Sequence, residues 1–103
     1  MRFVTKDLKF QGMRKEQNFV IYPCLPTDSI VWLQSDNRMV KIDLNTREAM
    51  ISKPTRQNGF HSVEEFFGAK KLILTLAELE KVMAMKEAMA GRTNADRTFT
   101  IGG

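Results

Sequence analysis

The chain has 103 residues, of which 43% are hydrophobic and 27% are charged, and its formal net charge is +4. This composition is typical of a single soluble globular domain, and the basic charge is compatible with binding to a polyanion. The single cysteine, Cys24, excludes an internal disulfide, and no window approaches the ~20 apolar residues of a membrane-spanning helix. Because residues 1–10 also lack the apolar region of a signal peptide, we expect a cytoplasmic protein that does not associate with membranes.

The N-terminal part of the chain predicts two strands and a connection. Residues 2–10 alternate loosely between polar and apolar side chains, and residues 18–22 form a second short run with strand character. The polar segment between them carries Arg14 and Lys15, so the two strands are expected to form a hairpin with a long, basic loop. Two prolines in residues 23–29 fix φ and remove backbone donors, which predicts a connection rather than a strand.

The clearest pattern is in residues 31–51, which predict three strands joined by two tight turns. We expect Asp36-Asn37 to form the first two-residue loop with positive φ angles, and Asn45-Thr46 to form the tip of the second hairpin. Both turns then place the same apolar side chains on one face of the sheet: Val31, Leu33, Val40, Ile42, Ala49 and Ile51. A slip of one residue in either turn would scatter this set over both faces, so the agreement of two turns supports the register.

The same register predicts the members of the opposite face. These are Ile30, Trp32, Gln34, Met39, Lys41, Asp43, Glu48, Met50 and Ser52. Trp32 lies opposite Lys41, and Lys41 lies opposite Met50, so an aromatic ring, a cation and a methionine are neighbours. This face is compatible with contact to solvent, to a partner or to a helix, and Trp32 alternatively packs under the N-terminal strands or in a dimer interface.

A short helix is expected after the polar segment 53–61. Ser62 and Glu65 match the Ser-x-x-Glu capping box, and Gly68 ends the helix after about two turns. The apolar run at residues 71–74 that follows is compatible either with a short last strand or with the lead-in to another helix.

A long helix is the clearest single element of the C-terminal part. Thr75 and Glu78 form a second capping box, and strong helix formers follow until Gly91, a natural C-terminal cap. One broad half of this helix is apolar, so we expect it to pack across the apolar face of the sheet. Residues 1–91 are therefore predicted to be one domain, and residues 92–103 a tail whose TFTI segment has the character of an added edge strand.

The predicted fold class is α+β: an antiparallel sheet of about five strands with a short helix and a long C-terminal helix packed on one face. This layout is similar to that of some small single-stranded DNA-binding regulators, although a layout does not specify a function.

No pattern in the sequence predicts catalysis, a cofactor or a metal site. The only histidine, His61, has no patterned partner, and Cys24 has no basic residue nearby in the sequence to lower its pKa. One histidine and one cysteine do not build an ordinary zinc site, and the six scattered glycines form no phosphate loop. We therefore expect a protein that is not an enzyme.

Basic and aromatic side chains instead favour binding to single-stranded DNA or RNA. Such binding requires cations that contact phosphates and flat side chains on which bases stack. The predicted nucleic-acid contacts are Trp32, Lys41, Arg38, Arg14, Lys15, Lys53 and Arg56. Asp43 and Glu48 lie on the same face as Trp32 and act against a continuous cationic strip.

A protein-interaction module, for example an inhibitor or an adaptor, is the alternative. Methionine and aromatic residues are common at binding surfaces, and a strand-like segment can pair with the edge of a partner's sheet. The predicted interface residues are Met39, Met50, Phe99 and Ile101. Burial of such a surface also leads us to expect a homodimer.

Overall fold

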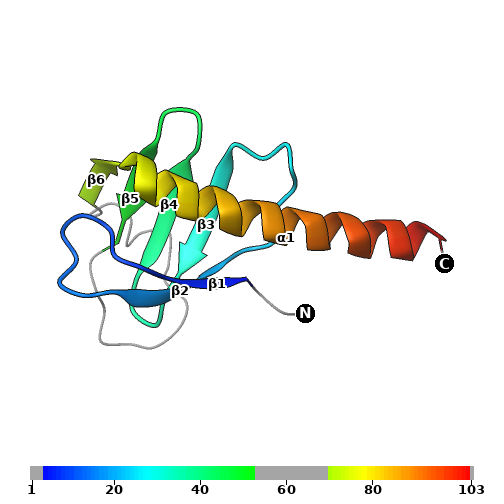
Figure 1. The fold of residues 1–103 in the computed structure, drawn as a ribbon, viewed down its shortest axis with the longest axis horizontal. Coiled ribbons are helices and arrows are strands. Elements are labelled where there is room, and N and C mark those ends of the chain that lie inside the picture. The colour runs from blue at the N-terminus through cyan, green and yellow to red at the C-terminus, as the bar shows by residue number, and fades with distance from the viewer. Residues whose placement is uncertain (1–3, 53–69, 103) are drawn as a thin grey trace.

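The computed structural model describes residues 4–52 and 70–102, which form one six-stranded antiparallel sheet and one helix (Figure 1). The elements are β1 (Thr5–Leu8), β2 (Gln17–Ile21), β3 (Ile30–Gln34), β4 (Met39–Asp43), β5 (Glu48–Ile51), β6 (Lys70–Ile73) and α1 (Leu76–Gly102). Each strand pairs with the next one in the sequence. The α+β class is confirmed, and the sheet has six strands rather than about five because β6 pairs with β5.

The predicted register of the three central strands is confirmed. Val31 pairs with Ile42 and Leu33 with Val40, and Ile42 pairs in turn with Ala49. All five side chains are buried. Their burial explains why the register is unique, since a slip of one residue would move every one of them to the other face.

The turn between β3 and β4 has the predicted length but not the predicted backbone. Neither Asp36 nor Asn37 has a positive φ angle. The N–H of Ser35 donates to the carbonyl of Arg38 at 2.9 Å, and the Ser35 hydroxyl accepts from the Arg38 N–H at 3.1 Å. A side-chain oxygen thus accepts the bond that a backbone carbonyl accepts in a regular two-residue turn, so the loop closes without left-handed residues.

The turn between β4 and β5 is held by its own side chains. Asp43 Oδ1 accepts hydrogen bonds from the N–H groups of Asn45 at 2.9 Å and Thr46 at 3.2 Å. Arg47 then adopts a positive φ of 65°. Its guanidinium donates to the carbonyl of Leu74 at 2.8 and 3.2 Å, and the Leu74 N–H donates to the Arg47 carbonyl at 2.9 Å. These bonds hold Arg47 in a left-handed backbone conformation, which is energetically unfavourable for residues other than glycine.

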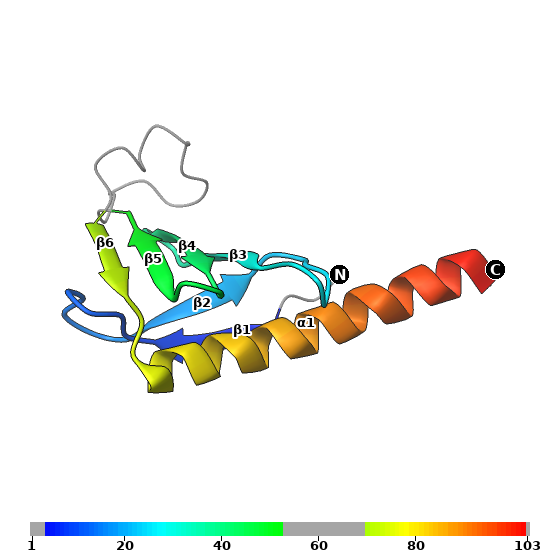
Figure 2. The same ribbon diagram turned by 90° about the horizontal axis from the view of Figure 1, so that it is seen from above.

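The sheet is strongly curved, so that the loop after β1 reaches β6 at the other end of the strand order (Figure 2). Gln11 Nε2 donates to the carbonyl of Ile73 at 2.7 Å. Gly12, with a φ of 85°, lies so close to Lys70 that an added Cβ atom would be 3.1 Å from the lysine Nζ. The positive φ favours glycine at position 12, whereas the exposed Lys70 side chain could move away from an added Cβ atom.

The helix α1 begins as predicted and covers the apolar face of the sheet. Thr75 Oγ1 accepts from the Glu78 N–H at 3.1 Å, and Glu78 Oε1 accepts from the Thr75 N–H at 2.7 Å, which confirms the capping box. Val82, Met85 and Met89 are buried in one cluster with the apolar face. We call this face, which packs against α1, the inner face, and the opposite one the outer face.

The helix does not end where the sequence predicts. It continues through Gly91 to Gly102, so residues 92–102 are helical rather than a tail or an edge strand. A glycine inside a helix costs only about 1 kcal/mol relative to alanine, so it does not by itself end one. Figures 1 and 2 show the last turns of α1 projecting beyond the sheet. Among the described residues, no helix has the length and apolar character that crossing a membrane requires.

Candidate functional site

The outer face presents one row of side chains, which we call the cross-strand row, that crosses four strands and ends at the residue directly after β2. The register pairs Lys71 with Met50, Met50 with Lys41, and Lys41 with Trp32. The N–H of Tyr22 donates to the carbonyl of Trp32 at 3.0 Å, which places Tyr22 at the end of this row. Because neighbouring strands lie about 4.8 Å apart, the five positions span about 19 Å of surface.

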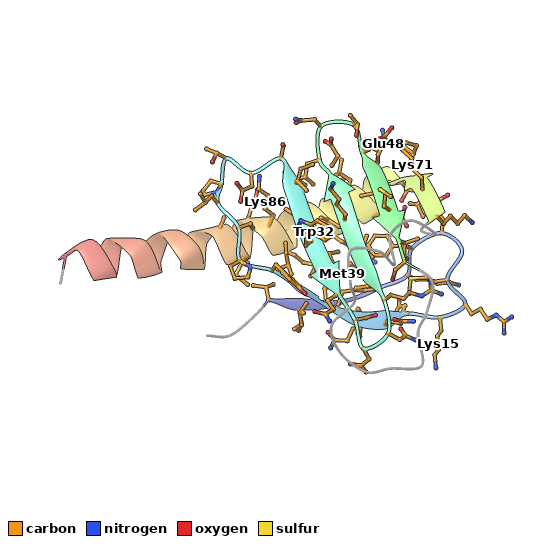
Figure 3. All side chains as sticks on the ribbon, turned by 180° about the vertical axis from the view of Figure 1, so that it is seen from behind. Lys15, Trp32, Met39, Glu48, Lys71 and Lys86 are labelled. Carbon is orange, nitrogen blue, oxygen red and sulfur yellow. The ribbon has the colours of Figure 1, made fainter. Side chains whose placement is uncertain are left out.

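Trp32 and Lys41 form the centre of the row. Lys41 Nζ lies 5.6 Å from the centroid of the indole ring, a cation–π contact. Both side chains are partly exposed. Figure 3 looks onto the outer face, with α1 behind the sheet, and shows Trp32 on β3 facing the viewer. An aromatic ring and a cation are thus held side by side on an accessible surface.

Two carboxylates of the outer face, Glu48 and Asp43, are engaged in local contacts. Glu48 forms an ion pair with Lys71 at 3.2 Å, and Figure 3 shows the two residues side by side. Asp43 accepts the two backbone hydrogen bonds of the β4–β5 turn. An exposed ion pair contributes only about 0–1 kcal/mol, so Lys71 can exchange Glu48 for another anion at little cost.

Tyr22 connects the cross-strand row to Gln34, which lies two residues beyond Trp32 on the same face of the sheet. Its hydroxyl donates to Gln34 Oε1 at 2.6 Å. Burial raises the pKa of the Tyr22 phenol, so the hydroxyl keeps its proton and remains a donor at neutral pH. The bond fixes the position of the Gln34 amide beside the aromatic residues of the row.

Arg38, a predicted nucleic-acid contact, is used within the fold. Its Nη1 donates to the carbonyl of Ser52 at 3.0 Å, and its Nε is buried without a partner among the described residues. Burial lowers the pKa of this guanidinium. Arg38 therefore connects the start of β4 to Ser52, directly after β5, while its side chain stays partly exposed.

Met39, a predicted interface residue, is only 5% exposed. Its N–H donates to the Ser52 hydroxyl at 2.9 Å, and the Ser52 N–H donates to its carbonyl at 2.9 Å. Ser52 is also buried. At this end the outer face is therefore closed, so Met39 is not presented to a partner, whereas Met50 in the cross-strand row remains partly exposed.

The loop cations form a separate basic rim. Arg14 and Lys15 are exposed on the loop after β1, and the same loop approaches Lys70 at Gly12. Figure 3 shows Lys15 at the edge of the molecule, away from Trp32. The structure therefore joins Trp32 and Lys41 in one row but places these loop cations on a neighbouring part of the surface.

Several predicted positions lie beyond what the structure describes. The short helix expected from Ser62, with the contacts Lys53 and Arg56, lies outside the described residues. Phe99 and Ile101 belong to the part of α1 that is described by its backbone alone.

Cys24 is buried in the connection between β2 and β3. Burial raises the pKa of its thiol, Asp28 raises it further, and Lys86 acts in the opposite direction. Lys86 belongs to α1, and its Nζ donates to the carbonyl of Pro26 at 3.0 Å. A cation absent from the local sequence is thus present in the fold, but the net rise keeps the thiol protonated and poorly nucleophilic.

Two members of the cross-strand row, Lys71 and Tyr22, are not among the predicted nucleic-acid contacts. Lys71 carries a readable signal, because Leu72 and Leu74 alternate with it as the buried residues of a strand do. Tyr22 carries none, because the long connection between β2 and β3 does not define a pairing register as a tight turn does.

Comparisons with protein-family models, curated proteins and solved structures found no match for this chain.

Proposed function

We propose that this is a non-enzymatic nucleic-acid-binding accessory or regulatory protein that favours single-stranded DNA or RNA. The observation that carries the proposal is the cross-strand row, which aligns two lysines, two aromatic rings and a methionine across an accessible sheet face. Single strands are bound where cations meet the phosphates and aromatic rings meet the bases. The row supplies both groups at the spacing of neighbouring strands.

Trp32 is the proposed stacking residue and Lys41 the proposed phosphate contact. Stacking of a base on an aromatic side chain contributes about 1–3 kcal/mol, whereas an exposed cation–π pair contributes about 0.5–1 kcal/mol. A base can therefore replace the Lys41 ammonium over the indole ring with a net gain. The displaced ammonium remains next to the bound strand, where a phosphate can accept its hydrogen bonds.

The basic rim extends the attraction beyond the row. Arg14, Lys15 and Lys70 are exposed, and the whole chain has a net charge of +4. Each phosphate contact with a single strand lowers the slope of log K against log salt by about 0.7. With three to five contacts, the expected slope is about −2 to −3.5.

Intrinsic fluorescence provides a direct test, because Trp32 is the only tryptophan in the chain. We expect single-stranded oligonucleotides of thymidine or uridine to quench Trp32 emission and to bind more tightly than a duplex of equal length. The fluorescence titration is repeated at several salt concentrations. Absence of binding at low salt would refute the proposal. Binding that neither changes Trp32 emission nor weakens as the salt concentration rises would also refute it.

Matched variants distinguish binding at the cross-strand row from non-specific attraction to the positive charge of the protein. Lys41→Gln should weaken binding, whereas Lys81→Gln makes the same charge change at an exposed position of α1, behind the sheet, and should have little effect. Trp32→Phe should retain part of the affinity that Trp32→Ala loses, because phenylalanine also offers a ring face. Equal effects of the two lysine variants would indicate attraction to overall charge without a defined site.

A protein partner is the second candidate, and exposed apolar side chains favour it. Ile73, which lies on the outer face opposite Glu48, is 50% exposed, and Leu76 at the start of α1 is 64% exposed. On this alternative, Ile73→Ser removes the function, whereas charge reversal at Arg14 and Lys15 leaves it intact. Sedimentation of the wild type and of Ile73→Ser tests whether the partner is a second copy of the chain.

A further inference from the structure

A depression of about 510 Å³ lies beside the cross-strand row on the outer face. Its lining residues are Thr5, Asn18, Val20, Gln34, Ser35 and Asp36. Thr5 pairs with Val20, and Val20 pairs with Gln34, so three neighbouring strands form its floor. A volume of this size lies within the range of small-ligand sites in proteins, about 300–1,000 Å³.

The depression adjoins the proposed stacking residue. Val20 and Gln34 lie two positions along their strands from Tyr22 and Trp32, on the same side of the sheet. Two residues of an extended strand cover about 6.6–6.8 Å. A ligand group in the depression is therefore a direct neighbour of a group stacked on Trp32.

The lining has the chemistry of a site for a flat group rich in hydrogen-bond donors. Val20 provides an apolar surface, Asn18 and Gln34 provide amides, and Asp36 provides the single charge. A phosphate is disfavoured because the lining contains a carboxylate and no cation. A nucleobase, which is flat, uncharged and polar at its edge, fits this lining better than the backbone of a nucleic acid does.

Some of these groups are oriented by the fold, and others remain available. The Tyr22 hydroxyl holds the Gln34 amide oxygen, and the Ser35 hydroxyl donates to Gln17 Oε1 at 2.7 Å. The exposed carboxylate of Asp36 forms no hydrogen bond or ion pair with any described residue. Asp36 is thus the acceptor that a ligand can use without breaking a bond within the protein.

We infer that the depression is a base-binding pocket that prefers guanine, with Asp36 as the acceptor of its Watson–Crick edge. The inference rests on the proposed function and names the preferred base. Guanine presents two adjacent donors, N1–H and the 2-amino group, which the two oxygens of a carboxylate accept as a pair. Adenine, cytosine and thymine each present donors next to acceptors, and these acceptors face the negative charge of Asp36. A base on Trp32 and a guanine in the pocket are then successive nucleotides of one strand.

The test is competition binding, followed by anisotropy, with thymidine oligonucleotides that carry one central substitution. A guanine should bind more tightly than adenine, cytosine or thymine by roughly five- to 150-fold, the discrimination of a good bidentate pair. Inosine lacks the 2-amino group and should lose most of this gain. The analogue 7-deazaguanine retains both donors and should preserve it.

Asp36→Asn should abolish the preference for guanine while leaving the affinity for plain thymidine strands unchanged or slightly higher. Glu80→Gln, at an exposed position of α1, makes the same charge change as the control and should leave the preference intact. Equal affinity for all bases together with quenching of Trp32 would overturn the pocket but not the proposed function.

A second measurement decides the inference if no oligonucleotide binds. Backbone amide shifts of Asn18 and Asp36 are followed by NMR during titration with guanosine 5′-monophosphate, and in parallel with adenosine 5′-monophosphate. The pocket is supported, even if the proposed function fails, when guanosine 5′-monophosphate shifts these amides and adenosine 5′-monophosphate does not. The shift of the Asn18 amide should then be lost in the Asp36→Asn variant. Equal responses to both nucleotides, or none, would overturn it.

Discussion

The inner and outer faces of the sheet are built from alternate residues of the same strands, yet their environments differ sharply. Val31, Leu33, Val40 and Ile42 on the inner face are at most 1% exposed, whereas their outer neighbour Trp32 is partly exposed. Burial of the inner face fixes the strand register, and the register in turn aligns the cross-strand row. Core burial is therefore concentrated on the inner face, whereas Trp32, Lys41 and Met50 on the outer face stay partly exposed.

The first and largest predicted effect comes from adjacent residues of β4 that face opposite ways. Ile42→Ala should lower the free energy of unfolding by about 2–5 kcal/mol, because it leaves a cavity in the hydrophobic core. Lys41→Ala should change it by about 0.5–1 kcal/mol or less, the cation–π contribution at an exposed site. Urea unfolding measures both, and comparable losses would show that the outer face also carries the stability of the fold.

The second prediction concerns the closed end of the outer face. Ser52→Ala leaves the N–H of Met39 without its acceptor in a buried site, which should cost about 1–3 kcal/mol. Thr27→Ala removes a hydroxyl from an exposed connection and serves as the control. Unfolding of both variants is compared in urea. If Ser52→Ala behaves like Thr27→Ala, the hydrogen bond from the Met39 N–H to the Ser52 hydroxyl contributes no measurable stability.

The third prediction tests how α1 is anchored over the inner face. Thr75→Ala removes the capping hydroxyl that accepts from the Glu78 N–H, and the expected loss is about 1 kcal/mol. Thr75→Ser keeps an acceptor at the same place and should restore most of the stability. A loss shared by the two variants would point to the threonine methyl group instead of the cap.

Much of the inner face was predictable from the sequence, for a physical reason. The apolar residues of three strands alternate with a period of two, and the loops at Asp36-Asn37 and Asn45-Thr46 are short enough to fix the pairing. The capping box at Thr75 is likewise a local signal. By contrast, the positive φ of Arg47 depends on hydrogen bonds to Leu74, which is distant in the sequence.

The candidate site was predictable only in part. The two hairpins predict the positions of Trp32, Lys41 and Met50. The position of Tyr22 depends on the pairing of β2 with β3, and the sequence of the long connection between them does not predict that register. The burial of Met39 and the hydrogen bond from Arg38 to Ser52 also escaped prediction, because the contacts of both residues with Ser52 are tertiary. Periodicity predicts the side of a strand on which a residue lies, but not what covers it.

The smallest predicted effect lies at the end of the cross-strand row and depends on pH. Burial raises the pKa of Tyr22 above its ordinary value of about 10, so above that pH the folded protein holds a proton that the unfolded chain releases. The stabilisation is therefore complete below pH ~10 and is lost as the pH rises through the folded-state pKa. Tyr22→Phe should remove this alkaline decline.

Tyr22 is the only tyrosine in the chain, so the ultraviolet absorbance of tyrosinate reports on this residue alone. Titration of the folded protein should give a pKa above that of the urea-unfolded chain, and urea unfolding from pH 9 upwards should show a steeper decline for the wild type than for Tyr22→Phe. A folded-state pKa at or below the unfolded value would contradict the burial of the Tyr22 hydroxyl. The bond to Gln34 would then no longer join the cross-strand row to the pocket beside it, and the outer face would be two separate surfaces.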